Sequence, residues 1–203
     1  MKRVIFIVII LFSAPFFASN ACLAASDWTG NANLTLGSKT LDEDDWEPVE
    51  SQSAVGADVD FARKSWPVHM AFAAIQSSDE DTVYAEVNDE MIRAKVKAST
   101  SELRFGVKKI WEPTLIMRPY VGVGLAIINA ELKTFLGSRF EGGSVSSDDQ
   151  GFGLWVSGGV FWTLFEKLNL GFTVGYSKAT SNLFDIDAES GGVNGAFCIG
   201  YHW

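Results

Sequence analysis

Hydrophobic and polar residues alternate along most of the chain, most clearly over the last eleven residues, VNGAFCIGYHW. One face of this segment is apolar and holds Val193, Gly195, Phe197, Ile199, Tyr201 and Trp203. The other face is small or polar, from Asn194 to His202. A strand of about 9–11 residues with one face toward lipid and one toward a lumen is typical of membrane barrels. The pattern therefore predicts a membrane-barrel strand at the C-terminal end.

The same period of two predicts seven further strands. They cover residues 28–36, 51–61, 68–76, a fourth strand ending near Lys108, 118–130, 151–162 and 168–177. In each strand the bulky apolar residues share one face, and glycines or polar residues share the other. Residues 84–97 leave the start of the fourth strand open, because they can extend a hairpin beyond the membrane. The predicted fold class is all-β, an eight-stranded antiparallel transmembrane β-barrel with up-and-down meander order.

The connections between these strands alternate in length, which predicts an orientation. Residues 62–67, 109–117 and 163–167 are short, whereas residues 37–50, 77–100, 131–150 and 178–191 are long. Bacterial barrels place short turns in the periplasm and long loops outside, so we expect both termini to be periplasmic. A soluble lipocalin-type barrel is the alternative, but it would turn its bulky apolar face inward around a ligand. The shared face of glycines and polar residues favours the membrane barrel.

The N-terminus has the pattern of a targeting segment. Lys2 and Arg3 precede an apolar run, residues 4–17, that is too short and too interrupted for a spanning helix. Small residues follow, with cleavage expected near residues 24–25, so residues 1–25 are predicted as a signal peptide and 26–203 as the barrel domain. Removing the two basic residues changes the formal charge from −9 to −11. This acidity argues against nucleic acid as a partner.

The two cysteines add little. Cys22 lies near the cleavage zone, but Ser19 stands where a lipoprotein signal has a Leu-like residue. Removal with the signal peptide is therefore favoured over lipidation. Cys198 then lacks a partner for a disulfide, and a small lumen-facing residue is the simplest interpretation.

Charged residues on the inward faces predict a network inside the lumen. This network comprises Asp58, Asp60, His69, Glu102, Arg104, Lys108, Arg118 and His202. Strand directions place most of these near the periplasmic mouth, and Glu102 and Arg104 nearer the middle or outer half. Buried charges need partners, so the favoured interpretation is a salt-bridged plug; a gated ion path or proton relay is the alternative. The inward rings of Tyr120, Trp155 and Phe161 narrow any path further.

Three segments carry a resemblance to a known family: MRPYVGVGL at 117–125, FGLWVSGGVFW at 152–162 and GFTVGYS at 171–177. The first resembles the Pro-Tyr-x-Gly-x-Gly strand of the small OmpA/OmpX/opacity-type outer-membrane barrels, and the others fit the same pattern. The terminal Phe197, Ile199, Tyr201 and Trp203 resemble the signal read by the outer-membrane barrel assembly machinery. The family includes structural anchors, adhesins, small-ligand channels and lipid-modifying enzymes. Because nothing follows Trp203, the peptidoglycan-binding domain of full-length OmpA is not expected.

An enzymatic role is disfavoured. Outer-membrane lipid A deacylases resemble this barrel but use a His and a Ser near the outer leaflet. His69 and His202 both map to the periplasmic end, and neither has a Ser two places on. We therefore expect no catalytic residues, no cofactor and no metal site.

The long connections are acidic, with LDEDDWEPVE at 41–50, DED at 79–81 and NDE at 88–90. Their spacing lacks the glycine placement of a calcium loop, which favours a solvated rim facing lipopolysaccharide over a cation site. The expected function is a monomeric outer-membrane barrel with a structural or surface-interaction role. The alternative is a narrow OmpW-like channel for small solutes or hydrophobic ligands, and an outer-membrane lipid-modifying enzyme ranks below both. The expected partners are outer-membrane lipids, lipopolysaccharide and the barrel assembly machinery.

Overall fold

The computed structural model describes residues 27–41, 46, 48–87, 90–112, 114, 116–136, 144–183 and 186–203. The predicted signal peptide and Cys22 lie outside the described residues, as do the acidic residues 42–45, 47 and 89, and Asn88. The described residues form β1 (Trp28–Thr40), β2 (Ser51–Arg63), β3 (His69–Val87), β4 (Glu90–Ile110), β5 (Met117–Leu136), β6 (Ser144–Leu164), β7 (Leu168–Leu183), β8 (Ile186–Glu189) and β9 (Gly192–His202). Among them, no helix combines the length and the apolar character needed to cross a membrane.

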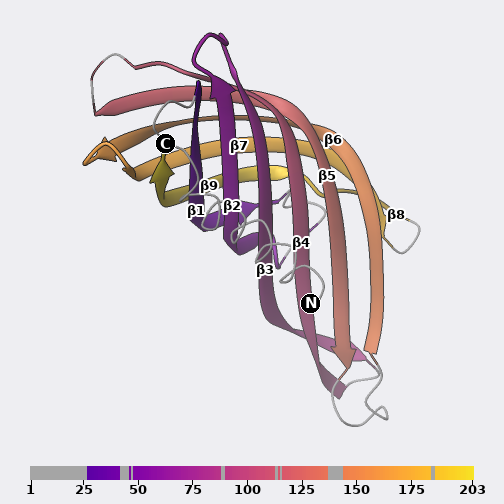
Figure 1. The fold of residues 1–203 in the computed structure, drawn as a ribbon. Helices are drawn as coiled ribbons and strands as arrows, with labels where there is room; N and C mark the ends of the chain where they lie inside the picture. The colour runs from indigo at the N-terminus through magenta and orange to yellow at the C-terminus, as the bar shows by residue number, and fades with distance from the viewer. Residues whose placement is uncertain are drawn as a thin grey trace.

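The strands close into a barrel (Figure 1). Each strand from β1 to β7 pairs antiparallel with the next, β7 pairs with β9, and β9 pairs with β1. The short β8 continues the line of β9 along β7, and the two are separated by Ser190 and Gly191. They therefore form one interrupted barrel strand, and the predicted eight-stranded antiparallel meander is confirmed.

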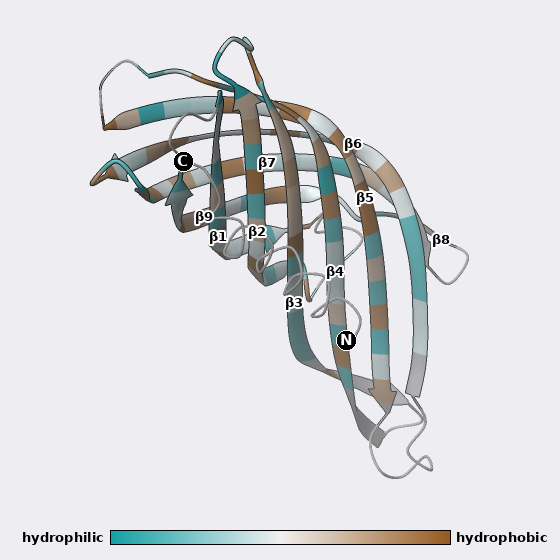
Figure 2. Ribbon diagram, in the orientation of Figure 1, coloured by the Kyte–Doolittle hydropathy of each residue, from teal (hydrophilic) through white to brown (hydrophobic). Residues whose placement is uncertain are grey.

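The predicted faces agree with the observed burial. Outward residues stay open, with Phe152 and Phe197 each 73% exposed, whereas the polar side chains of Asn31 and Asp60 are fully enclosed. Figure 2 shows the resulting alternation of hydrophobic and hydrophilic bands along the strands. A surface this apolar around a polar interior suits lipid outside and a hydrated or ion-paired interior.

The strand lengths differ from the prediction. The segment 77–100, counted among the long connections, is mostly a β-hairpin, as left open for residues 84–97: β3 runs to Val87 and β4 begins at Glu90. The segments 131–150 and 178–191 are likewise partly strand. Backbone pairing continues there although the alternation of apolar residues has stopped, because solvent on both faces removes the need for an apolar side. The hairpins of β3–β6 consequently protrude beyond the shorter strands, at the lower right of Figure 1.

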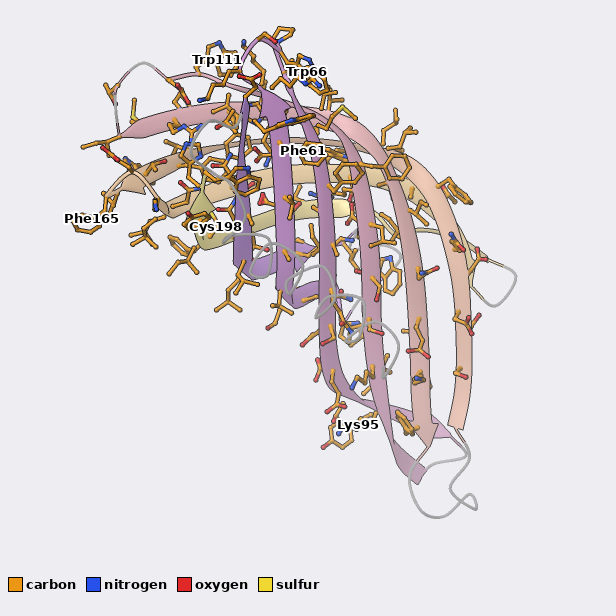
Figure 3. The ribbon with its side chains drawn as sticks, viewed as in Figure 1. Phe61, Trp66, Lys95, Trp111, Phe165 and Cys198 are labelled. Atoms are coloured by element: carbon orange, nitrogen blue, oxygen red, sulfur yellow. The ribbon has the colours of Figure 1, made fainter. Side chains whose placement is uncertain are left out.

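The opposite end of the barrel carries short connections. Residues 64–68, 111–116 and 165–167 join β2–β3, β4–β5 and β6–β7. In the last of these, Lys167 N–H donates to the carbonyl of Leu164 at 3.1 Å, and the two central residues of this β-turn, Phe165 and Glu166, have φ values of 51° and 64°, in the left-handed region of a type I′ turn. Figure 3 places Trp66, Trp111 and Phe165 at this end, far from Lys95 on the protruding hairpin. We call it the short-turn end.

Candidate functional site

The lumen contains two groups of ion-paired side chains that point inward from different levels of the barrel. The Asp60 cluster, which comprises Asp58, Asp60, His69 and Lys108, lies toward the short-turn end. The Glu102 cluster, which comprises Lys39, Glu102 and Arg104, lies toward the protruding hairpins. Inward positions of several strands meet in each cluster, because eight strands enclose a bore that side chains can span.

In the Asp60 cluster, Lys108 from β4 reaches across to β2. Its Nζ donates to Asp60 Oδ2 at 3.0 Å and to Asp58 Oδ1 at 3.1 Å. Asp60 also accepts a hydrogen bond from Asn31 Nδ2 at 2.7 Å and lies 2.9 Å from His69 Nδ1. The side chain of Asp60 is completely buried, so these partners replace the water it has lost.

Arg118 and His202 are placed beside this cluster but use other partners. Arg118 Nη2 pairs with Glu112 in the β4–β5 connection at 2.8 Å, and its Nη1 lies 2.9 Å from His202 Nδ1. Arg118 Nη1 also donates to Asn31 Oδ1 at 3.3 Å, so the arginine is linked to Asp60 through an amide. Arg118 and His202, two of the eight residues predicted for the lumen network, therefore contact Asp58 and Asp60 only indirectly.

In the Glu102 cluster, one carboxylate binds two bases. Arg104 Nε donates to Glu102 Oε1 at 2.7 Å, and Lys39 Nζ donates to Glu102 Oε2 at 3.2 Å. Lys39 also donates to Thr100 Oγ1 at 3.3 Å and to the carbonyl of Ser190 at 3.2 Å. Arg104 Nη2 donates to Asn194 Oδ1 at 3.0 Å, which ties β4 to β9 across the bore.

Lys39 is the principal residue that the sequence prediction missed. Asn31, Asn33 and Thr35 face inward, and the same parity continues to Lys39, whose side chain is 1% exposed. The predicted strand ended at residue 36, so the lysine was assigned to a loop. Asn169 is a second member outside the predicted network: its Nδ2 donates to Asn31 Oδ1 at 2.8 Å, and an uncharged amide gives no sign of such a contact in the sequence.

A cavity of about 60 Å³ separates the two clusters. Its walls include Lys108, Arg104 and the inward rings of Tyr120, Trp155 and Phe161. The Tyr120 and Phe161 rings stack 4.6 Å apart, and Lys108 Nζ lies 4.7 Å from the centroid of Tyr120. A space of this size, with the polar groups of Asp58, Arg104 and Lys108 in its walls, has room for a few water molecules but not for an open aqueous pore.

A third layer covers the lumen beyond the Glu102 cluster. Trp46, from the β1–β2 connection, is 2% exposed and packs with Leu41, Val49, Ala98 and Ala130. Its Nε1 donates to the carbonyl of Glu189 at 2.7 Å. The polar clusters and this apolar layer place packed side chains across the bore at three levels.

The protruding hairpins carry ion pairs exposed to solvent. Glu80 and Lys95, on adjacent strands, lie 2.7 Å apart, and the hydrogen bond from Lys95 lowers the pKa of Glu80. Glu131 and Lys133 form a similar pair at 2.6 Å. In the part of the chain that the structure describes, no group of three or more His, Cys, Asp or Glu side chains is arranged to hold a metal ion.

The predicted assembly signal lies on the outer face of β9 and at its end. Phe197, Ile199 and Tyr201 are exposed. Trp203 closes the barrel against β1, because its N–H donates to the carbonyl of Gly30 at 3.1 Å and its carbonyl accepts from Gly30 N–H at 3.0 Å. Its role in recognition by the assembly machinery stays a prediction.

Comparison with known proteins supports the fold. No protein-family model matches the sequence, and no curated protein matches it. The structure of Ail, the attachment invasion locus protein of Yersinia pestis, in complex with the heparin analogue sucrose octasulfate, is similar with a TM-score of 0.57 and 11% identity, covering 88% of this chain and 100% of Ail. Ail without that ligand gives a TM-score of 0.53 at 11% identity, with coverage of 86% and 98%. The predicted resemblance to small eight-stranded outer-membrane barrels is thus confirmed at the level of fold.

Proposed function

We propose that this protein is an outer-membrane barrel with a structural or surface-interaction role, and that the protruding hairpins are its interacting part. The observation that carries the proposal is the contrast between a blocked lumen and an extended external sheet. Ion pairs and the packed Trp46 narrow the bore on either side of the cavity, which disfavours the alternative of a channel for small solutes. The lumen residues therefore act as a structural plug, and the proposal includes no catalytic step.

The external sheet offers two strand edges for contact. Pairing between β2 and β3 stops at Ser78, although β3 continues to Val87. Pairing between β6 and β7 begins at Gly153, although β6 starts at Ser144. Beyond these points, among the described strands, β3 pairs only with β4 and β6 pairs only with β5. A strand edge without a neighbour can accept an extended peptide.

Charge sets the chemistry of the partner. Residues 41–50 contain six acidic residues and no basic one. Asp79 and Asp81 lie on the exposed segment of β3. A cationic segment of a surface protein therefore fits this end of the barrel. A polyanion such as the sulfated sugar bound to Ail is a poor fit.

The experiment that tests this function removes acidic charge from the β3–β4 hairpin without changing its strand pairing. Asp79→Asn and Asp81→Asn neutralise the exposed segment of β3 and leave the Glu80–Lys95 pair in place. Cells that display this neutralised protein should bind a polylysine-coated surface more weakly than wild-type cells, with a difference that shrinks at high salt. Equal binding at matched expression would refute the role of the hairpin.

The orientation follows the same proposal and needs its own test. An epitope inserted at residues 88–89 should be labelled by antibody on intact cells, whereas one inserted in the β6–β7 turn at 165–167 should be labelled only after the outer membrane is opened. The reverse pattern would show that the short-turn end faces outward.

A further inference from the structure

We propose that the outer surface of the short-turn end, around β1, β2 and the β2–β3 turn, is a binding site for the headgroup of an anionic phospholipid. The site comprises Trp28, Arg63, Lys64, Trp66 and Lys109, and we call it the basic-aromatic patch. The assignment to phospholipid rests on the proposed orientation, in which this end lies in the inner leaflet of the outer membrane.

Aromatic contacts build one side of the patch. The Trp28 ring lies 5.5 Å from the Trp66 ring and 6.0 Å from the Phe61 ring, and both tryptophans are partly open to the surroundings. Figure 3 shows Trp66 and Phe61 at this end of the barrel. Amphipathic tryptophan rings favour the headgroup level of a bilayer, which fixes the depth of the patch.

Basic groups are held against these rings. The guanidinium carbon of Arg63 lies 5.3 Å from the centroid of Trp28, the residue it pairs with across the β1–β2 ladder. Lys109, at an outward position of β4, donates from Nζ to the carbonyl of Pro67 at 2.7 Å, in the same turn as Trp66. One base from β2 and one from β4 therefore flank the β2–β3 turn. Arg63 is held by the Trp28 ring, and Lys109 is held by the carbonyl of Pro67 in the turn.

The charge of the patch differs from that of the whole protein. Arg63, Lys64 and Lys109 gather here with Asp27 as the neighbouring acid, whose carbonyl accepts from the Lys64 N–H at 2.8 Å. The chain as a whole carries a formal charge of −9. Basic side chains at headgroup depth attract anionic lipid, and a guanidinium supplies several donors in a geometry that matches phosphate. A phosphate at the β2–β3 turn would have bases from two strands and the tryptophan rings around it.

The opposite side of the short-turn end provides a matched control. Lys167 lies in the β6–β7 turn beside Phe165, at the same level of the barrel but on different strands. Its neighbour Glu166 is acidic, and the exposed Phe165 is the aromatic residue of that turn. If any base at this depth attracted phospholipid equally, Lys167 would contribute as much as Arg63 or Lys109.

The test uses the folded protein without its signal peptide, in detergent, titrated with phosphatidylglycerol or phosphatidylcholine and examined by native mass spectrometry. We expect tighter binding of the first phosphatidylglycerol. Arg63→Gln and Lys109→Gln should each weaken that binding by about fivefold, since one base near an anionic surface contributes about that factor. Phosphatidylcholine binding should stay unchanged in both variants, and Lys167→Gln should bind phosphatidylglycerol like the wild type. Heat-modifiable migration in gels confirms that each variant is folded.

Three outcomes would overturn the inference. They are equal binding of the two phospholipids by the wild type, a loss in Lys167→Gln as large as in Arg63→Gln, and unchanged binding in the double variant of Arg63 and Lys109. A parallel titration with lipid A separates the two leaflets, because tighter, Arg63-dependent binding of lipid A would reject phospholipid as the ligand. Lipid binding is measured without any surface partner, so failure of the hairpin experiment leaves this result intact, and the converse also holds.

Discussion

Lys108 is the residue whose removal tests the internal network most sharply. It donates to Asp58 at 3.1 Å and to Asp60 at 3.0 Å, and its own side chain is 6% exposed. Lys108→Met keeps most of the volume and removes the charge. Both carboxylates then remain inside the lumen without the cation that links them.

Asp58 and Asp60 differ in the partners that remain to them in Lys108→Met. Asp58 is partly open and accepts from Asn33 Nδ2 at 2.9 Å, so it retains one partner beside any water in the cavity. Asp60 is sealed, and it keeps only the Asn31 amide and His69. Breaking a buried pair by removing one partner costs about 3–5 kcal/mol. Because these remaining contacts offset part of the loss, we expect Lys108→Met to lower the free energy of unfolding by about 3 kcal/mol.

The assay is urea unfolding in phosphatidylcholine vesicles, followed by tryptophan fluorescence. Lys178→Met is the control, since this exposed lysine lies 3.6 Å from Glu189 and a surface pair contributes at most about 1 kcal/mol. Adding Asp60→Asn to Lys108→Met should recover part of the loss, with a coupling of at least about 1 kcal/mol. If the two lysine variants lose the same stability, or if the double-mutant cycle shows no coupling, the network does not stabilise the barrel.

Three further predictions test the wall of the barrel. Gly124→Ala should destabilise the barrel by about 1–3 kcal/mol, because the new Cβ would meet the backbone of β4. Gly195→Ala should be nearly neutral, because a Cβ there has nothing within 4 Å. Equal losses of unfolding free energy in vesicles would contradict this difference in packing. Val123→Arg places a charge on the outward face and should cost about 2–4 kcal/mol in the same assay, and a neutral result would mean that this face does not contact lipid. Deleting Trp203 should leave the protein in the periplasm, since the residue closes β9 against Gly30; normal amounts of heat-modifiable barrel in outer membranes would refute this.

The fold followed from the sequence because lipid imposes a strict rule on every membrane strand. An outward residue such as Val123 must be apolar and its inward neighbours small or polar, so a period of two marks both the strand and its facing. The cost of substituting an inward glycine does not follow from the alternation. An inward glycine such as Gly124 looks tolerant of a small side chain, but its close approach to β4 depends on register, which the alternation alone does not give.

The lumen was predicted in outline but not in its pairings. The alternation of strand positions identifies eight of the inward acids and bases. It does not identify Lys39, because the apolar side of β1 ends before this residue and the alternation stops. Arg118 was expected near the acids of β2, but it pairs with Glu112 in a turn, because a long side chain can reach several strands. The insertion of Trp46 into the mouth had no signal in the sequence, since its loop has no periodic pattern. Side-chain reach and loop packing are thus the parts that periodicity leaves undetermined.

A plugged scaffold should not conduct ions, and single-channel recording of the refolded protein in planar bilayers measures this. The Asp60 cluster, the Glu102 cluster and the packed Trp46 lie in series, so the wild type should show no discrete conductance steps at any salt concentration. Discrete steps whose size grows with the conductivity of the bath would show an open path through the lumen and favour a channel.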